Sequence, residues 1–213
     1  MKFFNLPEKI SGLIFDIDNT LYECEEFIQA QETGLISRLA EEKGKSFSVM
    51  KAEIDLYRQK FAVRNGGKRP SLGNTFVEFG IPIPTSADWR ESIIVPEDYL
   101  TVDMTLAAVL EKLSRRYGLI TVTNNPVSTG KRILRALGVE AYFLDVIGLD
   151  KSGVSKPHTI PFHLAAEAIG VKPANCVSIG DRYEVDIEIP LSMGMGGVLV
   201  EGIQDTYNLT EVL

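Results

Sequence analysis

The sequence predicts an α/β protein whose parallel sheet is covered by helices on both faces, with a helical segment inserted near its start. Short apolar runs that end in polar residues or Gly alternate with segments of helical periodicity, as in strands joined by crossover helices. Several of these runs are apolar at every position, which suits strands buried on both faces. One long interval, residues 22–102, contains no such run and interrupts the alternation.

Five buried strands are predicted from the apolar runs. The first covers residues 12–15 and leads directly into an acidic segment. The other four cover residues 119–122, 142–147, 176–179 and 197–200. Because helical segments separate the last four strands, we expect these strands to lie parallel in one sheet.

Three helices are predicted between these strands, from apolar residues that recur three and four positions apart. Their apolar stripes cover residues 106–113, 133–137 and 162–169. A glycine follows each stripe, where a residue of left-handed conformation often ends a helix: Gly118, Gly138 and Gly170.

The chain is predicted to have two parts, an α/β core at residues 1–21 and 103–213 and an inserted helical domain at 22–102. Apolar residues at helical spacing indicate two amphipathic helices in the insertion, over about 27–39 and 49–61. A Gly-rich loop and two shorter helical pieces follow. The inserted domain would therefore stand between the first strand and all the others.

The composition excludes some classes of partner. The chain of 213 residues has 29 acidic residues against 22 Lys and Arg, so no basic excess is present to bind a nucleic acid polymer. No apolar run is long enough to span a membrane, and the N-terminal residues lack the apolar centre of a signal peptide. Cys24 and Cys176 lie far apart and outside any metal-binding spacing. A cytoplasmic protein is predicted.

Two carboxylates, Asp16 and Asp18, follow the first predicted strand. Ligands of an open parallel sheet bind beyond the carboxyl ends of its strands, so both side chains are expected to face a ligand. Two anions this close are unfavourable unless a cation or a proton lies between them, and a hard divalent ion would meet that need. The alternative is that Asp18, Asn19 and Thr20 form only a turn or a helix cap.

Polar residues also follow other predicted strands and loops. Thr123 and Asn124 stand before a helix and could form an anion pocket, and Lys156 adds a cation. Asp181 and Asp186 follow the fourth predicted strand. Each has a structural alternative: a strand end, a solvated lysine, or an acid that stabilises a helix N-terminus. Their common location at strand and loop ends favours a shared site.

Together these residues resemble the four sequence motifs of the haloacid dehalogenase-like hydrolase superfamily. The matching residues, in motif order, are Asp16, Asp18 and Thr20, then Thr123, then Lys156, and last Asp181 and Asp186. The resemblance covers the whole chain and implies a three-layer Rossmann-like core. The insertion resembles the branch with a helical cap after the first strand, and the motifs look most like those of pyrimidine 5′-nucleotidases and small-metabolite phosphatases.

The resemblance implies a phosphatase mechanism that depends on magnesium. Asp16 would be the nucleophile that forms an aspartyl-phosphate, and Asp18 would be the general acid and then the general base. Mg²⁺ would be held by Asp16, the backbone carbonyl of Asp18 and Asp181, with Asp186 binding the metal or supporting a ligand. Pro190 is tolerated only in a first helical turn, so the helix after the fourth motif should start close to Asp186.

The resemblance also implies a small-molecule substrate, such as a nucleotide or a sugar phosphate. Thr123, the Asn124 backbone and Lys156 would bind its phosphoryl group. Asp18 favours a phosphatase over a dehalogenase, because dehalogenases of the superfamily lack this second aspartate. A phosphomutase remains an alternative, as does a non-catalytic binding or regulatory module on the same fold. The sequence does not distinguish a monomer from a homodimer.

Several side chains of the insertion are candidates for contact with the substrate. Three cations could meet an anionic substrate or form a solvated loop: Arg64, Lys68 and Arg69. Three aromatic residues could stack on a base or pack inside the insertion: Tyr57, Phe76 and Trp89. Hinges at residues 21–23 and 98–103 would let the insertion close over the core.

Overall fold

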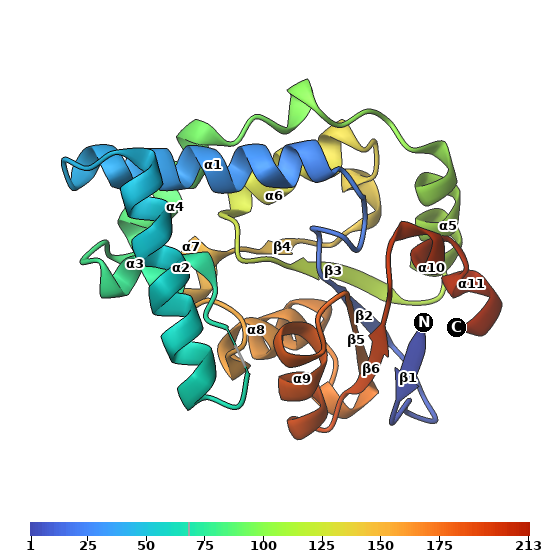
Figure 1. Cartoon of the computed structure of the whole chain (residues 1–213). Coiled ribbons are helices and arrows are strands. Elements are labelled where there is room, and N and C mark those ends of the chain that lie inside the picture. The colour runs from blue at the N-terminus through green and yellow to red at the C-terminus, as the bar shows by residue number, and fades with distance from the viewer. Residues whose placement is uncertain (68) are drawn as a thin grey trace.

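A computed structural model describes residues 1–67 and 69–213 and has a mostly parallel sheet at its centre (Figure 1). In the described residues the sheet has six strands in the order β1-β6-β5-β2-β3-β4. The strands are β1 (Lys2–Phe4), β2 (Gly12–Phe15), β3 (Gly118–Val122), β4 (Val146–Ile147), β5 (Cys176–Gly180) and β6 (Gly196–Leu199). Each neighbouring pair is parallel except β1 with β6. The predicted α/β class is confirmed.

Helices cover both faces of the sheet. Consecutive residues of β2 point to opposite faces and therefore pack against different helices. Leu13 and Phe15 belong to an apolar cluster with residues of α5 (Met104–Ser114) and α6 (Val127–Ala136). Ile14 belongs to a second cluster with residues of α8 (Thr159–Ile169). Figure 1 shows α6 on one side of the sheet and α8 on the other. The arrangement is a three-layer α/β core.

The remaining short elements belong to this core, except η1, which lies in the segment between β2 and α5. They are α7 (Leu149–Ser152), α9 (Glu188–Ser192), α10 (Ile203–Tyr207), α11 (Leu209–Val212), three 3₁₀ turns η1 (Pro96–Asp98), η2 (Glu140–Tyr142) and η3 (Pro173–Asn175), and a π-helical turn η4 (Tyr183–Ile187). No helix in the described ranges combines the length and the hydrophobicity that a bilayer crossing requires.

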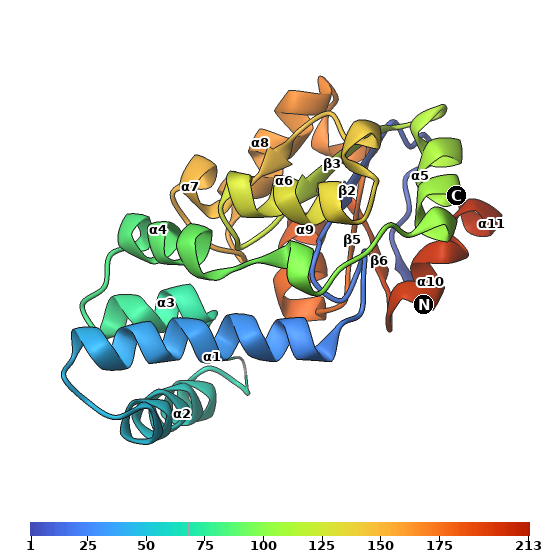
Figure 2. The same cartoon turned by 90° about the horizontal axis from the view of Figure 1, so that it is seen from above.

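The segment between β2 and α5 forms four helices with an apolar cluster of their own. They are α1 (Glu25–Glu42), α2 (Phe47–Arg64), α3 (Leu72–Glu78) and α4 (Ile83–Ile93). Leu35, Met50 and Phe76 are buried between them, and Phe76 meets Trp89 edge to face at 6.2 Å. Figure 2 shows these inserted helices to one side of the sheet. Most of their buried apolar residues form this separate core, while Phe27 of α1 packs in a cluster against the sheet.

Polar contacts attach the inserted helices to the α/β core. Arg132 of α6 donates a hydrogen bond of 2.9 Å to the carbonyl of Ile94, at the end of α4. The same guanidinium forms two hydrogen bonds to Glu97 of η1, at 2.9 and 2.7 Å. At another point the Ser155 hydroxyl donates to Asn74 Oδ1 of α3 at 2.8 Å. The insertion is thus held to the core near both α3 and α4.

Two strand predictions differ from the structure. The run 142–147 forms a strand only at β4, because η2 precedes it and Leu144 is 61% exposed at this edge of the sheet. Strand β1 was not predicted, because a run as short as Lys2–Phe4 carries little alternation. It pairs antiparallel along β6 and covers that edge of the sheet.

The glycine predictions are correct at two positions and wrong at one. Gly138 and Gly170 have φ of 75° and 79°, in the left-handed region, as predicted at helix ends. Gly118 instead begins β3, where a Cβ would stand 2.5 Å from Ile169 Cγ2 of α8. Close packing of a helix on the strand therefore requires this glycine.

Candidate active site

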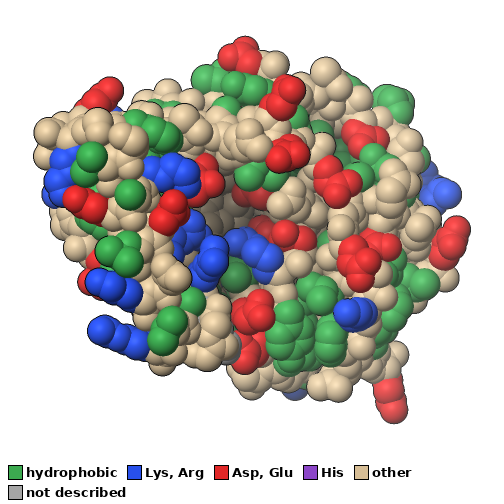
Figure 3. All heavy atoms as spheres, viewed as in Figure 1, with side chains coloured by type: hydrophobic (Ala, Val, Ile, Leu, Met, Phe, Trp, Pro, Cys, Tyr) green, Lys and Arg blue, Asp and Glu red, His purple; other side chains and the backbone are tan. Residues whose placement is uncertain are grey.

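A pocket of about 620 Å³ lies between the inserted helices and the carboxyl ends of the strands. Asp18, Lys156 and Asp181 line it from the core, and Arg58 and Arg90 line it from the insertion. The strands β2, β3 and β5 are in register, so the segments that follow them emerge at the same edge. Figure 3 shows a hollow in this face with Lys and Arg side chains gathered beside it.

Lys156 forms a buried ionic contact with two of the predicted site carboxylates. Its Nζ lies 2.7 Å from Asp16 Oδ1 and 2.7 Å from Asp186 Oδ1, and the lysine is 1% exposed. Burial alone would lower the pKa of Lys156, but Asp16 and Asp186 raise it above its ordinary value. The ammonium group therefore stays charged and fixes both carboxylates.

Asp186 is held from several sides. Its Oδ2 accepts a hydrogen bond from the Arg182 amide at 3.2 Å, and its backbone carbonyl accepts one from the Ser178 hydroxyl at 2.6 Å. A Cβ at Gly180 would lie 2.4 Å from the Asp186 Cβ, so only glycine allows this approach. Burial and the neighbouring Asp16 raise the pKa of Asp186 to about 6. The helix containing Pro190 begins at Glu188, just after Asp186, close to the predicted position.

Three carboxylates of this edge could hold a metal ion. Oxygens of Asp16, Asp181 and Asp186 lie within 4.8 Å of one another. Among the described residues, Asp16 Oδ2 and Asp181 Oδ1 are buried without a hydrogen-bond partner. Arg182 lies close to both, with its Nη2 3.7 Å from Asp16 Oδ2 and its Nε 3.5 Å from Asp181 Oδ1. Hard oxygen donors without a hydrogen-bond partner fit a divalent cation such as Mg²⁺.

Both oxygens of Asp18 accept hydrogen bonds. The Tyr22 hydroxyl donates to Oδ1, and Asn125 Nδ2 donates to Oδ2 at 3.2 Å. Burial and the nearby Asp16 raise the pKa of Asp18 above its ordinary value, although the hydrogen bond from Tyr22 opposes this. A carboxyl group of this kind keeps a proton to higher pH than an exposed aspartate does, which suits proton donation.

The predicted phosphate-binding residues lie in adjoining loops. Thr123 is buried, and its Oγ1 accepts a hydrogen bond from the backbone N–H of Asn125 at 3.1 Å. The side chain of Asn124 accepts from the Lys156 amide at 2.7 Å and donates to its carbonyl at 3.4 Å. Asn124 therefore connects the loop after β3 to the loop that carries Lys156.

Of the candidate substrate contacts in the insertion, some line the pocket and others do not. Arg69 lines the pocket, Arg64 is exposed outside it, and Lys68 lies outside the described residues. The aromatic candidates Tyr57, Phe76 and Trp89 do not line it; Phe76 and Trp89 are buried in the insertion's core, and Tyr57 packs against other rings of the insertion.

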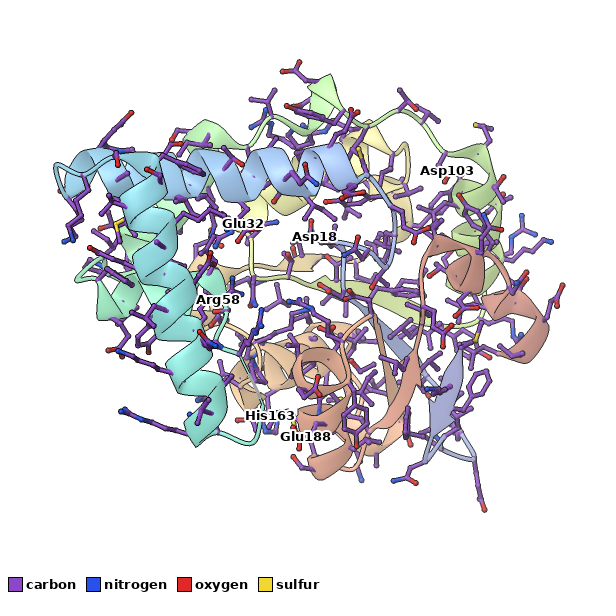
Figure 4. The ribbon with its side chains drawn as sticks, in the orientation of Figure 1. Asp18, Glu32, Arg58, Asp103, His163 and Glu188 are labelled. Carbon is purple, nitrogen blue, oxygen red and sulfur yellow. The ribbon has the colours of Figure 1, made fainter. Side chains whose placement is uncertain are left out.

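Other residues of the site were not predicted from the sequence. Asn125 and Arg182 directly follow predicted site residues, so their position along the chain could have indicated that they belong to the site. Arg58, Arg90 and Tyr22 belong to no motif. Figure 4 shows Arg58 on α2, with Glu32 on α1 and Asp18 next to the sheet, around the same space. Arg58 lies 3.6 Å from Glu32.

Comparisons with known proteins identify the family to which the chain is similar. A family model for haloacid dehalogenase-like hydrolases matches residues 10–194. A phosphoglycolate phosphatase of Xylella fastidiosa is 29% identical over 86% of this chain and 76% of its own length. A glyceraldehyde 3-phosphate phosphatase of Methanocaldococcus jannaschii is 21% identical over 87% and 82%. The match to a rat N-acylneuraminate-9-phosphatase, at 27% identity, covers only 46% of this chain and 39% of that protein.

Solved structures share the fold. A phosphatase of this superfamily from Thermococcus onnurineus superposes with a TM-score of 0.63, at 21% identity, over 95% of this chain and 97% of the other. A β-phosphoglucomutase from Clostridium difficile superposes with a TM-score of 0.53, at 18% identity, over 96% and 100%. These likenesses describe the fold of the chain.

Proposed function

Because the chain belongs to the haloacid dehalogenase-like hydrolase family, we propose that it is a magnesium-dependent phosphatase of small phosphorylated metabolites. Relatives that match most of the chain are phosphatases, which supports hydrolysis of phosphoric monoesters. The observation that carries the proposal is the pair Asp16 and Asp18. Asp18 lines the pocket, and Asp16 is buried against Lys156, which also lines it.

In the proposed reaction Asp16 attacks phosphorus and the bond from phosphorus to the leaving oxygen breaks, which forms an aspartyl-phosphate. Lys156, 2.7 Å from Asp16, neutralises part of the charge that the phosphoryl group brings. Thr123 and the Asn124 backbone are proposed to donate hydrogen bonds to phosphoryl oxygens. Two displacements replace one, and each has a lower barrier than direct attack by water.

Asp18 is proposed to move the proton in both steps. It first gives a proton to the departing oxygen, so that an alcohol leaves. Its carboxylate then accepts a proton from the water that attacks the aspartyl-phosphate, and inorganic phosphate and free Asp16 result. Its raised pKa supports the first role, because the proton must be present before the bond breaks.

The carboxylate oxygens that lack a hydrogen-bond partner support magnesium as the cofactor. Asp16, the Asp18 backbone carbonyl and Asp181 are proposed to hold the ion, which when bound supplies positive charge and alignment for the phosphoryl group. Asp186 has both oxygens in hydrogen bonds to Lys156 and the Arg182 amide, so we assign it the role of supporting the site.

The inserted helices are proposed to act as a cap that covers the reacting group and selects the leaving group. Their side of the pocket offers Gln31, Arg58 and Arg69, which can donate hydrogen bonds to hydroxyl or anionic groups. Sugar phosphates and nucleotides both carry such groups. Closure at the predicted hinges, 21–23 and 98–103, would exclude water from the reaction.

The proposal is tested by incubating the purified chain with Mg²⁺ and a panel of phosphate esters, including p-nitrophenyl phosphate, and measuring released phosphate. We expect turnover that Asp16→Asn abolishes, while Asp55→Asn, an exposed aspartate of α2, leaves it unchanged. A folded protein that releases no phosphate from any ester would contradict the proposal. Transfer of phosphate to a second hydroxyl instead of water would indicate a phosphomutase.

A further inference from the structure

We infer that Arg90 and Asn125 are positioning residues, which together hold Asp18 in the orientation needed to protonate the leaving group. Arg90 belongs to α4 of the insertion, and Asn125 follows β3 in the core. Proton donation would then depend on the seating of α4 against the core. The inference rests on the proposed phosphatase function and adds two residues that none of the four motifs contains.

A continuous series of hydrogen bonds joins the two residues to Asp18. Arg90 Nη1 donates to Asn125 Oδ1 at 3.1 Å, and Asn125 Nδ2 donates to Asp18 Oδ2 at 3.2 Å. Gln31 of α1 adds an acceptor 3.5 Å from the same Asn125 nitrogen. The side chain of Asn125 therefore lies between a donor of the insertion and the carboxyl group of the proposed acid.

Arg90 determines which way the Asn125 amide points. A guanidinium group has only hydrogen-bond donors, so it can face only the oxygen of the amide. The amide nitrogen must then face Asp18, where it can act only as a donor. Without Arg90 the amide oxygen would lose its hydrogen-bond donor, and only the acceptors Asp18 and Gln31 would orient the group.

A fixed donor at Oδ2 assigns the proton of Asp18 to its other oxygen. Oδ1 faces the Tyr22 hydroxyl, which can donate to a carboxylate or accept from a protonated carboxyl group. Asn125 offers no such choice at Oδ2. The contacts therefore leave Oδ1 as the oxygen at which Asp18 could exchange a proton.

The burial of Arg90 is consistent with its proposed role of holding Asn125. The residue is 8% exposed, and its Nε has no hydrogen-bond partner among the described residues, although it lines the pocket. An arginine buried with an unsatisfied donor costs stability. Burial lowers the pKa of Arg90 to about 10, so the side chain is still a cation at neutral pH.

The leaving group provides the test, since a general acid matters for an alkoxide and little for p-nitrophenolate. For Arg90→Met and Asn125→Leu we expect kcat/KM toward an alkyl phosphate to fall by about 10²-fold or more, a typical contribution of general acid catalysis. The fall toward p-nitrophenyl phosphate should be at least about tenfold smaller. Asp18→Asn should show the same selectivity, and the double variant should be no worse than Asn125→Leu, because both act through one contact.

The matched control is Arg38→Met, because Arg38 is a cap arginine that stacks on Trp89 at 5.1 Å, outside the pocket. It should not change the ratio between the two substrates. Equal losses on both substrates in Arg90→Met and Asn125→Leu would overturn the inference. If Arg90→Met does not fold, Asn125→Leu and Arg90→Lys decide, with Lys retaining part of the alkyl phosphate activity. A wild-type protein inactive on both substrates would instead overturn the proposed function.

Discussion

At the scale of single residues, Lys156 is a buried cation with two buried carboxylate partners. It is the only described cation within 3 Å of Asp16, and it also bonds Asp186. Its role combines stability and chemistry, because the same ammonium group neutralises two buried carboxylates and would meet the phosphoryl group. A lysine on a solvated surface can be replaced with little effect, whereas replacement of this buried lysine is expected to be costly.

Lys156→Met should therefore destabilise the fold. Removing one partner of a buried ionic contact costs about 3–5 kcal/mol, because the remaining charges are left unpaired. The same substitution at Lys151, whose partner Asp145 is partly exposed, should cost about 0–1 kcal/mol. Urea unfolding of the two variants at pH 7 measures both values. Similar losses would show that the Lys156 contact carries no special weight.

Gly180 is a second residue whose replacement is expected to disturb the site. Gly180→Ala places a methyl group against the Asp186 side chain, which must move and take Lys156 with it. Overpacking of this kind costs about 1–3 kcal/mol. Gly73→Ala is the matched control, because a Cβ there meets no atom closer than 3.9 Å. Thermal unfolding should show a lower Tm for Gly180→Ala alone; equal Tm values would contradict the crowding.

At the scale of elements, the inserted helices have an apolar core separate from the clusters that cover the sheet. Polar contacts join them to the α/β core at Arg132, Ser155 and Asn125, and Phe27 of α1 also packs in an apolar cluster that covers the sheet. An element stabilised by its own core can open while the rest of the fold persists. The predicted domain boundary at residues 22–102 therefore has an experimental consequence.

Phe76→Ala should loosen α1 to α4 more than the sheet. Phe76 is fully buried in the insertion, and truncation of such a residue costs about 3–5 kcal/mol. Hydrogen exchange should show protection lost first in α1 to α4, with β2 and β5 retaining theirs. Phe162→Ala, in the cluster between α8 and the sheet, is the comparison expected to affect the strands. Uniform loss of protection in Phe76→Ala would argue against a separately stabilised insertion.

At the scale of the whole molecule, three acidic residues of a protein with net charge −7 cluster at the carboxyl ends of the strands. Asp16 comes from the end of β2, while Asp181 and Asp186 follow β5, and these segments meet because the two strands are in register. An ion that binds only this assembled arrangement must stabilise the folded chain.

Addition of Mg²⁺ should therefore raise the Tm of the protein. An ion present at a hundred times its dissociation constant stabilises by about 2.7 kcal/mol. Asp181→Asn should weaken this response, and Asp55→Asn, an exposed aspartate of α2, should retain it. Calorimetric titration provides a second measurement that does not depend on turnover. A Tm that Mg²⁺ does not change would contradict the proposed metal site.

The sequence by itself determined the fold class and the residues that carry the motifs. Buried strands of β2, β3 and β5 and most helices were predictable because apolar periodicity is a local signal. The sequence also predicted Asp16, Asp18, Lys156 and Asp181 as site residues, because they follow strands or loops in a recurring order. The short edge strands β1 and β4 were missed or overextended, because so few residues carry little pattern.

Only the tertiary structure decided how the site is assembled. Arg90 and Asn125 are 35 positions apart, and Asn125 and Asp18 are 107 apart, so no spacing in the sequence connects them. Arg58 in place of Arg64 at the pocket, and Phe76 and Trp89 in the insertion's core, likewise depend on how helices pack. Periodicity along a chain reports which face of an element is apolar. Which polar groups from distant parts of the chain come into contact depends on how one element packs on another.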